Sequence, residues 1–388
     1  MRITWVNPSF GHYRVPVYRE LDVMSGGRLH VVCSASRTDE EPLAALSAAL
    51  GDRVIAVRGE RVLHVGRRTS FANHGTQVPY QRGLLRAILQ TDPECLIGEG
   101  FFQWTPAALA ASLRRRIPLV IAYERTAHTE RHAGNLRQLY RRRVSCAVDA
   151  IACNGTLSRD YCVSALGFAP ERIVIGAMAA DTGRMESGTL AAEPPAVRSL
   201  PRPRFLFVGE LVVRKGAQEL IEGWARAVAT RRGLGSLLFV GEGPERSRLE
   251  SMVRTLGLDF VRFAGRVHYG DMPAYYAACD ALVMPTLEDN WSLVVPEAMA
   301  AGKPVLCSVH NGCWPELVHD GENGWTFDPL DPAATASMLL AASKARDQLR
   351  DMGLVSRRIA AGFTPRRAAE AVFEACTIAV RHRHARVK

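Results

Sequence analysis

A chain of 388 residues is too long for one ordinary domain, and its apolar share of 47% is enough to build two hydrophobic cores. Its nine cysteines form no C-x-x-C pair and follow no regular spacing, which argues against a zinc ribbon and a disulfide framework. The apolar runs are too short and too interrupted to span a bilayer, and we expect no signal peptide at the start. These features favour a reducing, cytoplasmic setting.

The first half of the chain alternates between apolar strands and helices. Residues 1–10 read as a strand, Gly11 as a turn and residues 16–24 as a helix, which together form the first unit of a Rossmann-like domain. The turn is not the dinucleotide fingerprint, because no G-x-G-x-x-G follows. Further strands are expected at 29–33, 53–58, 95–98, 118–123, 150–153 and 172–175, with helices at 106–115 and 134–147 among them. This alternation predicts a mostly parallel sheet covered on both faces.

A stretch rich in glycine, alanine and proline, residues 187–203, predicts a linker between two domains. It would join an N-terminal domain, residues 1–186, to a second α/β domain, residues 204–364. In the second domain we expect strands at 204–208, 237–240, 261–264, 281–284 and 305–308, and helices at 272–279 and 332–342. The remaining segment, residues 365–388, begins with a helix that runs to about residue 380.

The most informative stretch is MPTLEDNWSLVVPEAMAAG, residues 284–302. The end of an apolar strand is followed by a polar loop, and Ser292 is expected to cap a short helix over residues 293–301. The free N–H groups and the dipole at such a cap favour an anion.

Two acids flank that cap. Glu297 would stand about 7.5 Å from it along the helix axis, at about 1.5 Å per residue, which suits the ribose hydroxyls of a nucleotide whose phosphate lies at the cap. Asp289 lies on the other side, where a sugar linked to the phosphate would lie. The pattern therefore favours a nucleotide-sugar site, and an ordinary helix with an acidic first turn is the alternative.

These residues resemble the E-x7-E region of the retaining GT-B glycosyltransferases of family 4, also called group 1. The resemblance implies a GT-B fold, an α/β architecture of two Rossmann-like domains that face a central cleft. It also implies that residues 1–186 hold the acceptor, that residues 204–364 hold the donor, and that the helix in 365–388 crosses back to the N-terminal domain. It covers residues 205–328 specifically and the first half only loosely, through layout and Gly11.

Carried over position by position, the resemblance assigns Asp289 to the hydroxyls of the donor sugar and Glu297 to the ribose. The backbone amides of the residues between them would hold the diphosphate; these residues are Asn290, Trp291, Ser292 and Leu293. Aspartate stands where glutamate is usual, so Glu288 is an alternative acid if the loop is shifted by one residue. Trp291 and Ser292 replace the usual aromatic–glycine pair.

A second part of the donor site is expected after the strand over 204–208. The family has a basic residue after the glycine here, Gly209, and a lysine before the next glycine. Lys215 matches the lysine, whereas Glu210 stands at the basic position, so Arg214 is the candidate for the missing charge. The backbone near Val267 would read the edge of the nucleobase. A plain basic surface turn is the alternative.

On the acceptor side, Gly11 would approach the donor diphosphate, and His128 would lie near the transferred sugar. His128 and His132 are spaced like one face of a helix, but HTERH matches neither H-E-x-x-H nor H-x-x-E-H and has no evident third ligand. We therefore expect no metal and no cofactor besides the nucleotide-sugar substrate. The charge on the leaving diphosphate would be offset by Lys215, Arg214, the amides of residues 290–293 and the helix dipole, while Asp289 contacts the sugar. The family has no protein nucleophile, and none is nominated.

The net charge of +10 fits an anionic substrate or an anionic membrane face, and nucleic acid is not the expected partner. Its local clusters are Arg114–Arg116, Arg141–Arg143 and the tail 381–388, for which solvated helix faces are the alternative.

The resemblance implies transfer of a hexose from a UDP- or GDP-sugar to a saccharide or lipid-linked acceptor. The setting would be bacterial polysaccharide or glycolipid assembly, in the cytoplasm or peripherally at the inner face of the membrane. Three alternatives remain: glycosylation of a small-molecule natural product, a GT-B-fold epimerase or phosphorylase, and a non-catalytic basic binding protein.

Overall fold

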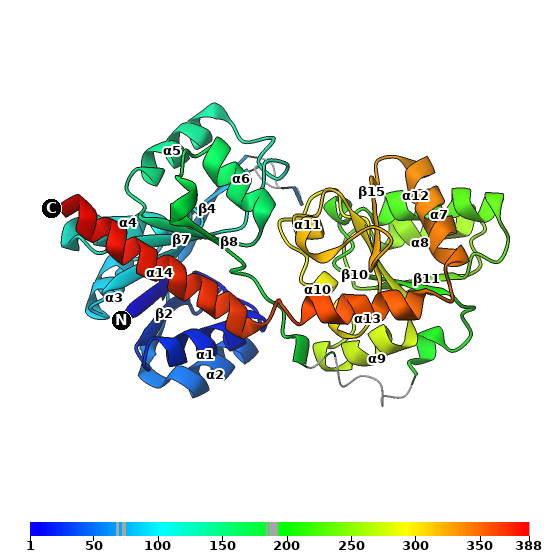
Figure 1. Ribbon diagram of the computed structural model, residues 1–388, viewed down its shortest axis with the longest axis horizontal. Helices are drawn as coiled ribbons and strands as arrows, with labels where there is room; N and C mark the ends of the chain where they lie inside the picture. Colours follow the sequence, from blue (N-terminus) through cyan, green and yellow to red (C-terminus); the bar gives the residue numbers. More distant parts are fainter. Residues whose placement is uncertain (67–69, 72–74, 184, 186–192, 388) are drawn as a thin grey trace. The chain divides into compact units, whose positions relative to one another are not determined.

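The protein, a computed structural model, is described over residues 1–66, 70–71, 75–183, 185 and 193–387. Within the predicted linker, residues 187–192 lie outside this description. The chain forms two compact units (Figure 1). Unit 1 comprises Met1–Ala179 together with Phe363–Lys388, and unit 2 comprises Ala180–Gly362.

Unit 1 is built on a parallel sheet with strand order β3-β2-β1-β6-β7-β8-β9. The strands are β1 (Ile3–Val6), β2 (Leu29–Ser34), β3 (Val54–Val57), β6 (Cys95–Glu99), β7 (Leu119–Tyr123), β8 (Ala150–Cys153) and β9 (Ile173–Ile175). Its helices are α1 (Arg14–Met24), α2 (Glu40–Leu50), α3 (Leu84–Gln90), α4 (Thr105–Arg115), α5 (Asn135–Ser145), α6 (Thr156–Ser164) and α14 (Pro365–Val387). The expected parallel sheet with helices on both faces is confirmed.

The two faces of this sheet carry different helices because successive strand residues point to opposite sides. Side chains of α1, α2 and α14 pack with one set of strand residues, and those of α3 to α6 pack with the other. The first strand is shorter than the predicted 1–10, since residues 7–13 form the loop into α1. An antiparallel hairpin of β4 (Arg61–Gly66) and β5 (Gly75–Tyr80) was not predicted.

Unit 2 repeats the plan with strand order β12-β11-β10-β13-β14-β15, all parallel. The strands are β10 (Arg204–Val208), β11 (Ser236–Val240), β12 (Val261–Gly265), β13 (Ala281–Met284), β14 (Val305–Ser308) and β15 (Gly324–Phe327). The helices are α7 (Ala217–Thr230), α8 (Arg246–Thr255), α9 (Met272–Ala278), α10 (Val294–Ala300), α11 (Trp314–Leu317), α12 (Pro332–Lys344) and α13 (Leu349–Ala360). Sequence patterns missed α7, α8, α13 and β15.

In both sheets the chain reverses its direction of travel beside the first strand. In unit 1 this switch lies between β1 and β6, and in unit 2 it lies between β10 and β13. Loops that leave the carboxyl ends of two such strands diverge, and the crevice between them is where open α/β sheets bind ligands. The fold therefore predicts a ligand-binding crevice at the switch point of each unit.

The C-terminal helix α14, red in Figure 1, belongs to unit 1 and packs against α1 and β8. Its end is held by Asp149, which is fully buried at the start of β8. Arg383 donates to Asp149 Oδ2 at 2.6 and 3.0 Å, and His382 Nδ1 lies 3.1 Å from Oδ1. Asp149 also accepts the Leu119 amide at 2.9 Å, so one carboxylate joins α14 to two strands.

We predict that Asp149→Asn lowers the free energy of unfolding by about 3–5 kcal/mol, because it leaves a buried guanidinium without its counter-charge. Guanidinium denaturation measures this change. The matched control is Asp160→Asn on the exposed side of α6, for which a surface ion pair predicts a change below about 1 kcal/mol. Equal changes in the two variants would contradict the role given to Asp149.

Candidate functional site

The predicted donor residues lie on the two loops that leave the switch strands of unit 2. One loop follows β10 and contains the short 3-10 turn Val213–Lys215, and the other follows β13 and leads into α10. Gly216 has φ +70°, and a Cβ there would lie 1.9 Å from the carbonyl oxygen of Pro285. Only glycine permits this approach, which brings the cationic turn against the acidic loop.

The backbone of Arg214 joins the two loops. Its carbonyl oxygen accepts hydrogen bonds from the Thr286 hydroxyl at 3.0 Å and from the Leu287 amide at 2.8 Å. Its guanidinium returns a hydrogen bond to the carbonyl of Glu288 at 3.3 Å. The loops therefore form one hydrogen-bonded body in which residue 215 faces residue 289.

Lys215 and Asp289 form a largely buried ion pair. Lys215 Nζ lies 2.5 Å from Asp289 Oδ2, Arg214 Nη1 lies 3.8 Å from the same oxygen, and the side chains of the pair are 14% and 12% exposed. Burial by itself would raise the pKa of Asp289, but Lys215 and the hydrogen bond from Ser292 hold that pKa below its usual value. Two cations thus face one ionised carboxylate.

The predicted cap at Ser292 is wrong. Helix α10 begins at Val294, and the Ser292 hydroxyl donates to Asp289 Oδ2 at 2.7 Å instead of accepting a helix amide. The ionised carboxylate is the stronger acceptor within reach. The Trp291 amide also donates to Asp289 Oδ1 at 3.2 Å, so the N-terminal loop of α10 folds around this acid.

Some of the backbone amides of residues 290–293, which were predicted to bind the diphosphate, already donate hydrogen bonds within the protein. The Ser292 amide donates to Asn311 Oδ1 at 3.3 Å, and Trp291 is occupied by Asp289 as described above. Asn311 is fully buried and was not predicted; it lies on the loop after β14, where it also accepts from the Cys313 thiol at 3.2 Å. Asn311 lies between His310 and Gly312, where asparagine before glycine indicates an ordinary turn, so sequence inspection does not single it out as a site residue.

Glu297 lies in α10, nearly buried, and its carboxylate is held by two tyrosines. The Tyr276 hydroxyl donates to Oε2 at 2.9 Å and the Tyr269 hydroxyl donates to Oε1 at 3.2 Å. Burial raises the pKa of Glu297 to about 7, although both tyrosine hydrogen bonds act in the opposite direction. Asp181 adds to the rise. This carboxyl therefore changes charge near neutral pH.

The other predicted donor residues of unit 2 differ in exposure. Glu288 is buried and Glu210 is exposed, whereas Val267 lies half-buried on the loop between β12 and the turn that carries Tyr269. Gly209 donates its amide to the carbonyl of Val240 at 3.0 Å, at the end of β10. The half-buried residues also include Asn290 and Leu293.

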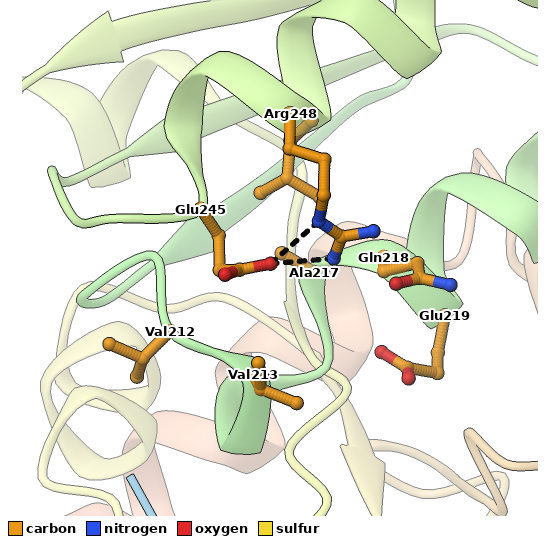
Figure 2. Close-up of a pocket in the computed structure, with 8 residues that line it drawn as sticks. Val212, Val213, Ala217, Gln218, Glu219, Glu245 and Arg248 are labelled. Carbon is orange, nitrogen blue, oxygen red and sulfur yellow. Dashed lines mark hydrogen bonds and ion pairs between the residues drawn. The ribbon is translucent and has the colours of Figure 1, made fainter. Parts of the chain in front are cut away.

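A small pocket lies beside the same cationic turn (Figure 2). Arg248 and Glu245, both at the start of α8, form an ion pair at 2.6 Å on one side of it. Its lining residues are Val212, Val213, Ala217, Gln218, Glu219, Glu245, Arg248 and Leu249. None of the predicted site residues is among them, so this pocket is separate from the Lys215–Asp289 pair.

In unit 1 the switch point carries a cluster that the sequence did not reveal. Glu99 ends β6, and its Oε1 accepts from Trp5 Nε1 at 2.9 Å and from Asn7 Nδ2 at 3.0 Å. The guanidinium of Arg14, buried at the start of α1, lies 3.7 Å from the same oxygen and 5.2 Å from the Trp5 ring centroid. Gly11 lies in the loop that leads to Arg14 and accepts its amide at 3.1 Å.

Glu99 is the accessible member of this cluster. Its side chain is 23% exposed, and Oε2 has no partner among the described residues. Burial raises the pKa of Glu99, and Glu124 adds to that rise, whereas Arg14 and the Trp5 hydrogen bond oppose it. The cluster joins β1, β6 and α1, so only the folded chain brings its members together.

His128 lies half-buried in the turn that follows β7, in unit 1. Residues 127–132 form turns and not a helix, so the helical spacing considered for His128 and His132 does not apply. Over the described residues, no group of three or more His, Cys, Asp or Glu side chains could hold a metal ion. His128 and the donor residues belong to different units and are not placed relative to one another.

Two family models match the chain. Residues 19–184 match "Glycosyltransferase Family 4", and residues 202–344 match "Glycosyl transferases group 1". The D-inositol 3-phosphate glycosyltransferase of Geodermatophilus obscurus is 33% identical over 183 residues, which are 45% of this chain and 40% of that relative. The enzyme of the same name from Thermomonospora curvata is 27% identical over 74% of this chain and 71% of its own length.

Among solved structures, Anabaena HepE in complex with UDP superposes with a TM-score of 0.72 at 18% identity, covering 97% of this chain and all of that chain. A complex of the same protein with UDP-glucose gives a TM-score of 0.69. With two parallel-sheet, Rossmann-like domains, the protein has the GT-B fold of glycosyltransferases. The chain belongs to the family 4, group 1 glycosyltransferases, a family of transferase enzymes.

The ionisation of Glu297 predicts how stability depends on pH. Between about pH 4.5 and 7 the folded protein retains a proton that the unfolded chain has released, so stability falls as the pH rises through this window. At about 1.4 kcal/mol for each pH unit the loss approaches 3 kcal/mol. Denaturation of Glu297→Gln should therefore show a smaller loss of stability from pH 5 to pH 8 than the wild type.

The control for this measurement is Glu322→Gln, which removes an exposed carboxylate from the same unit. It should leave the pH dependence of the wild type intact. A Glu297→Gln variant with the same pH profile as the wild type would contradict the assignment.

Proposed function

We propose that the protein transfers a hexose from a UDP- or GDP-sugar to a saccharide or glycolipid acceptor, with retention of anomeric configuration. The observation that carries this proposal is the Lys215–Asp289 pair, with Arg214 beside it, at the switch point of unit 2. Family membership supports the reaction class, and the GT-B neighbours solved with UDP and UDP-glucose support a uridine donor as the first to test.

The cations supply the charge that the leaving group needs. The phosphates of a nucleoside diphosphate would bind the Lys215 ammonium and the Arg214 guanidinium. These two cations can balance more negative charge than the single carboxylate of Asp289 provides. Stabilisation of charge on the departing diphosphate is the role that a divalent ion has in metal-dependent enzymes. We therefore propose a reaction that needs no metal or other cofactor.

Donor binding would exchange the partners of the ion pair. When the diphosphate binds Lys215, the Asp289 carboxylate is released to accept hydrogen bonds from the hydroxyls of the sugar. Glu297, oriented by its two tyrosines, would accept those of the ribose, and the backbone near Val267 would contact the base. Asp289 is favoured over Glu288 for the sugar because Asp289 is the acid that contacts Lys215.

Retention without a protein nucleophile requires that the acceptor attack from the face that the diphosphate leaves. Departure of the diphosphate would develop positive charge on the sugar, as in other glycosyl transfers. His128 remains the proposed contact of unit 1 with the transferred sugar, and Gly11 its proposed contact with the donor diphosphate. The proposed setting is polysaccharide or glycolipid assembly.

The acceptor would bind at the switch point of unit 1. Trp5 and Asn7 hold Oε1 of Glu99 and leave Oε2 to accept a hydrogen bond from an acceptor hydroxyl. The relatives named D-inositol 3-phosphate glycosyltransferases make a phosphorylated polyol a second acceptor class to test beside saccharides.

The function is tested by thermal shift with UDP, GDP, ADP and their sugars, followed by an assay of released nucleotide with and without acceptor. A shift with one nucleotide class and acceptor-dependent release of the diphosphate would support transfer. Release of inorganic phosphate when a sugar 1-phosphate replaces the nucleotide-sugar as donor would indicate a phosphorylase, and release of nucleotide without acceptor would indicate an epimerase or hydrolase. No shift with any nucleotide would overturn the proposal.

We predict opposite effects of two substitutions in the ion pair. Lys215→Ala should weaken UDP binding and lower turnover by about 10²-fold or more, the scale of losing one charge stabiliser. Asp289→Asn should leave UDP affinity unchanged or increased, because Lys215 is no longer neutralised, while transfer from the UDP-sugar falls by a similar factor. Calorimetry with UDP and steady-state kinetics measure the two quantities.

Lys344→Ala, at the exposed end of α12, is the matched control and should behave as the wild type. If Asp289→Asn and Lys215→Ala weakened UDP binding equally, the exchange of partners would be wrong.

For the acceptor site we predict that Glu99→Gln raises the acceptor KM by about 10-fold or more, the value of a hydrogen bond to a charged group. The Kd for UDP should stay within about twofold of the wild type. The control is Glu94→Gln, which removes a carboxylate just before the opposite end of β6. An unchanged acceptor KM for Glu99→Gln would remove this residue from the site.

A further inference from the structure

Helix α5 of unit 1 presents an apolar and cationic face to solvent. Leu136 is 85% exposed and Leu139 is 52% exposed. Arg142 and Arg143 are exposed on the following turn. At 100° per residue these four side chains fall within one third of the helix circumference. Two large exposed leucines three residues apart form a small apolar patch, and the arginines border it.

This face has no carboxylate to balance its charge. The two nearest acids in the sequence are both buried and paired elsewhere. Glu130 forms a two-point ion pair with Arg141, with 2.9 Å between Nη2 and Oε1, and Asp149 pairs with Arg383 at 2.6 Å. On the neighbouring helix α6, Asp160 pairs with Arg159 at 2.9 Å. Among the described residues, neither Arg142 nor Arg143 forms an ion pair.

Arg141 therefore differs from its two neighbours in the predicted cluster Arg141–Arg143. It is buried and structural, and the solvated-face alternative does not hold for it. The cluster contributes two surface charges instead of three.

The opposite side of α5 is firmly packed. The guanidinium carbons of Arg137 and Arg141 lie 5.4 and 5.3 Å from the ring centroid of Phe102. The ring of Tyr140 stacks on the same phenylalanine at 5.1 Å, and its hydroxyl donates to the carbonyl of Phe101 at 3.1 Å. The helix is thus held in one orientation, and Leu136 and Leu139 cannot turn inward without breaking these contacts.

We propose that this face of α5 (Leu136, Leu139, Arg142 and Arg143) docks on an anionic phospholipid surface. The leucines would enter the boundary between headgroups and acyl chains, and the arginines would contact lipid phosphates, which is the division of roles in interfacial helices. Over the described residues no helix has the length and apolar character to cross a bilayer, so contact would be made along the surface. The proposal does not depend on the identity of the donor.

The experiment is flotation of the full-length protein with vesicles of phosphatidylcholine, with and without about a third of phosphatidylglycerol. Wild-type protein should bind only the anionic vesicles. Arg142→Gln/Arg143→Gln should weaken binding by about 10-fold or more, since each arginine near such a surface contributes about fivefold. Leu136→Ser/Leu139→Ser should also weaken binding, and its residual binding should be more sensitive to salt because only charge remains.

Two controls separate a local surface from the net charge of +10. Arg231→Gln/Arg232→Gln removes two adjacent exposed arginines from unit 2, and Leu354→Ser removes a leucine on α13 that is 53% exposed. Both should bind vesicles as the wild type does. Circular dichroism melting should show that every variant is folded, and none of these changes should alter release of UDP with a water-soluble acceptor.

The proposal is overturned if the wild type does not bind anionic vesicles, or if the unit 2 arginine variant loses as much binding as the α5 variant. It is also overturned if the leucine variant binds like the wild type and single-stranded DNA displaces the vesicles, since that result indicates a polyanion site without an apolar component.

Discussion

The proposed donor site depends on one largely buried ion pair, formed by Lys215 and Asp289. Each charge would be costly to bury alone, and each is retained because the other lies 2.5 Å away. The pair holds the turn after β10 against the loop after β13, and the Arg214 carbonyl reinforces that junction through backbone hydrogen bonds. The two loops are therefore held together by the protein's own contacts, and in the proposed function donor binding exchanges charges within this junction.

The pKa values of Asp289, in the loop after β13, and Glu297, in α10, are shifted in opposite directions. Lysine and serine donors hold Asp289 ionised, whereas Glu297 lies among tyrosines and burial makes it easier to protonate. Groups whose pKa values are driven apart by their surroundings are characteristic of functional sites. In the proposed function the first contacts a sugar and the second a ribose, so only ribose binding would respond to pH near neutrality.

Local patterns predicted the fold class, most strands and the positions of Asp289, Glu297 and Lys215, because these residues lie in short stretches whose order reflects strand, loop and helix. The cap at Ser292 was wrong because a carboxylate three residues earlier competes for the hydroxyl. The cluster around Glu99 was missed because its partners come from β1 and α1, some 90 residues away. Contacts between residues this far apart in the chain cannot be predicted from the spacing of residues in short motifs.

The absence of a side chain at Gly216 sets a limit on how this site can diversify. Even a methyl group there would press on Pro285 and separate the cationic turn from the acidic loop. If this junction binds the donor as proposed, changes in donor preference would have to come from the side chains around it and not from its closely packed backbone. Engineering of new sugar specificity should leave Gly216 and Pro285 unchanged and vary the residues around them.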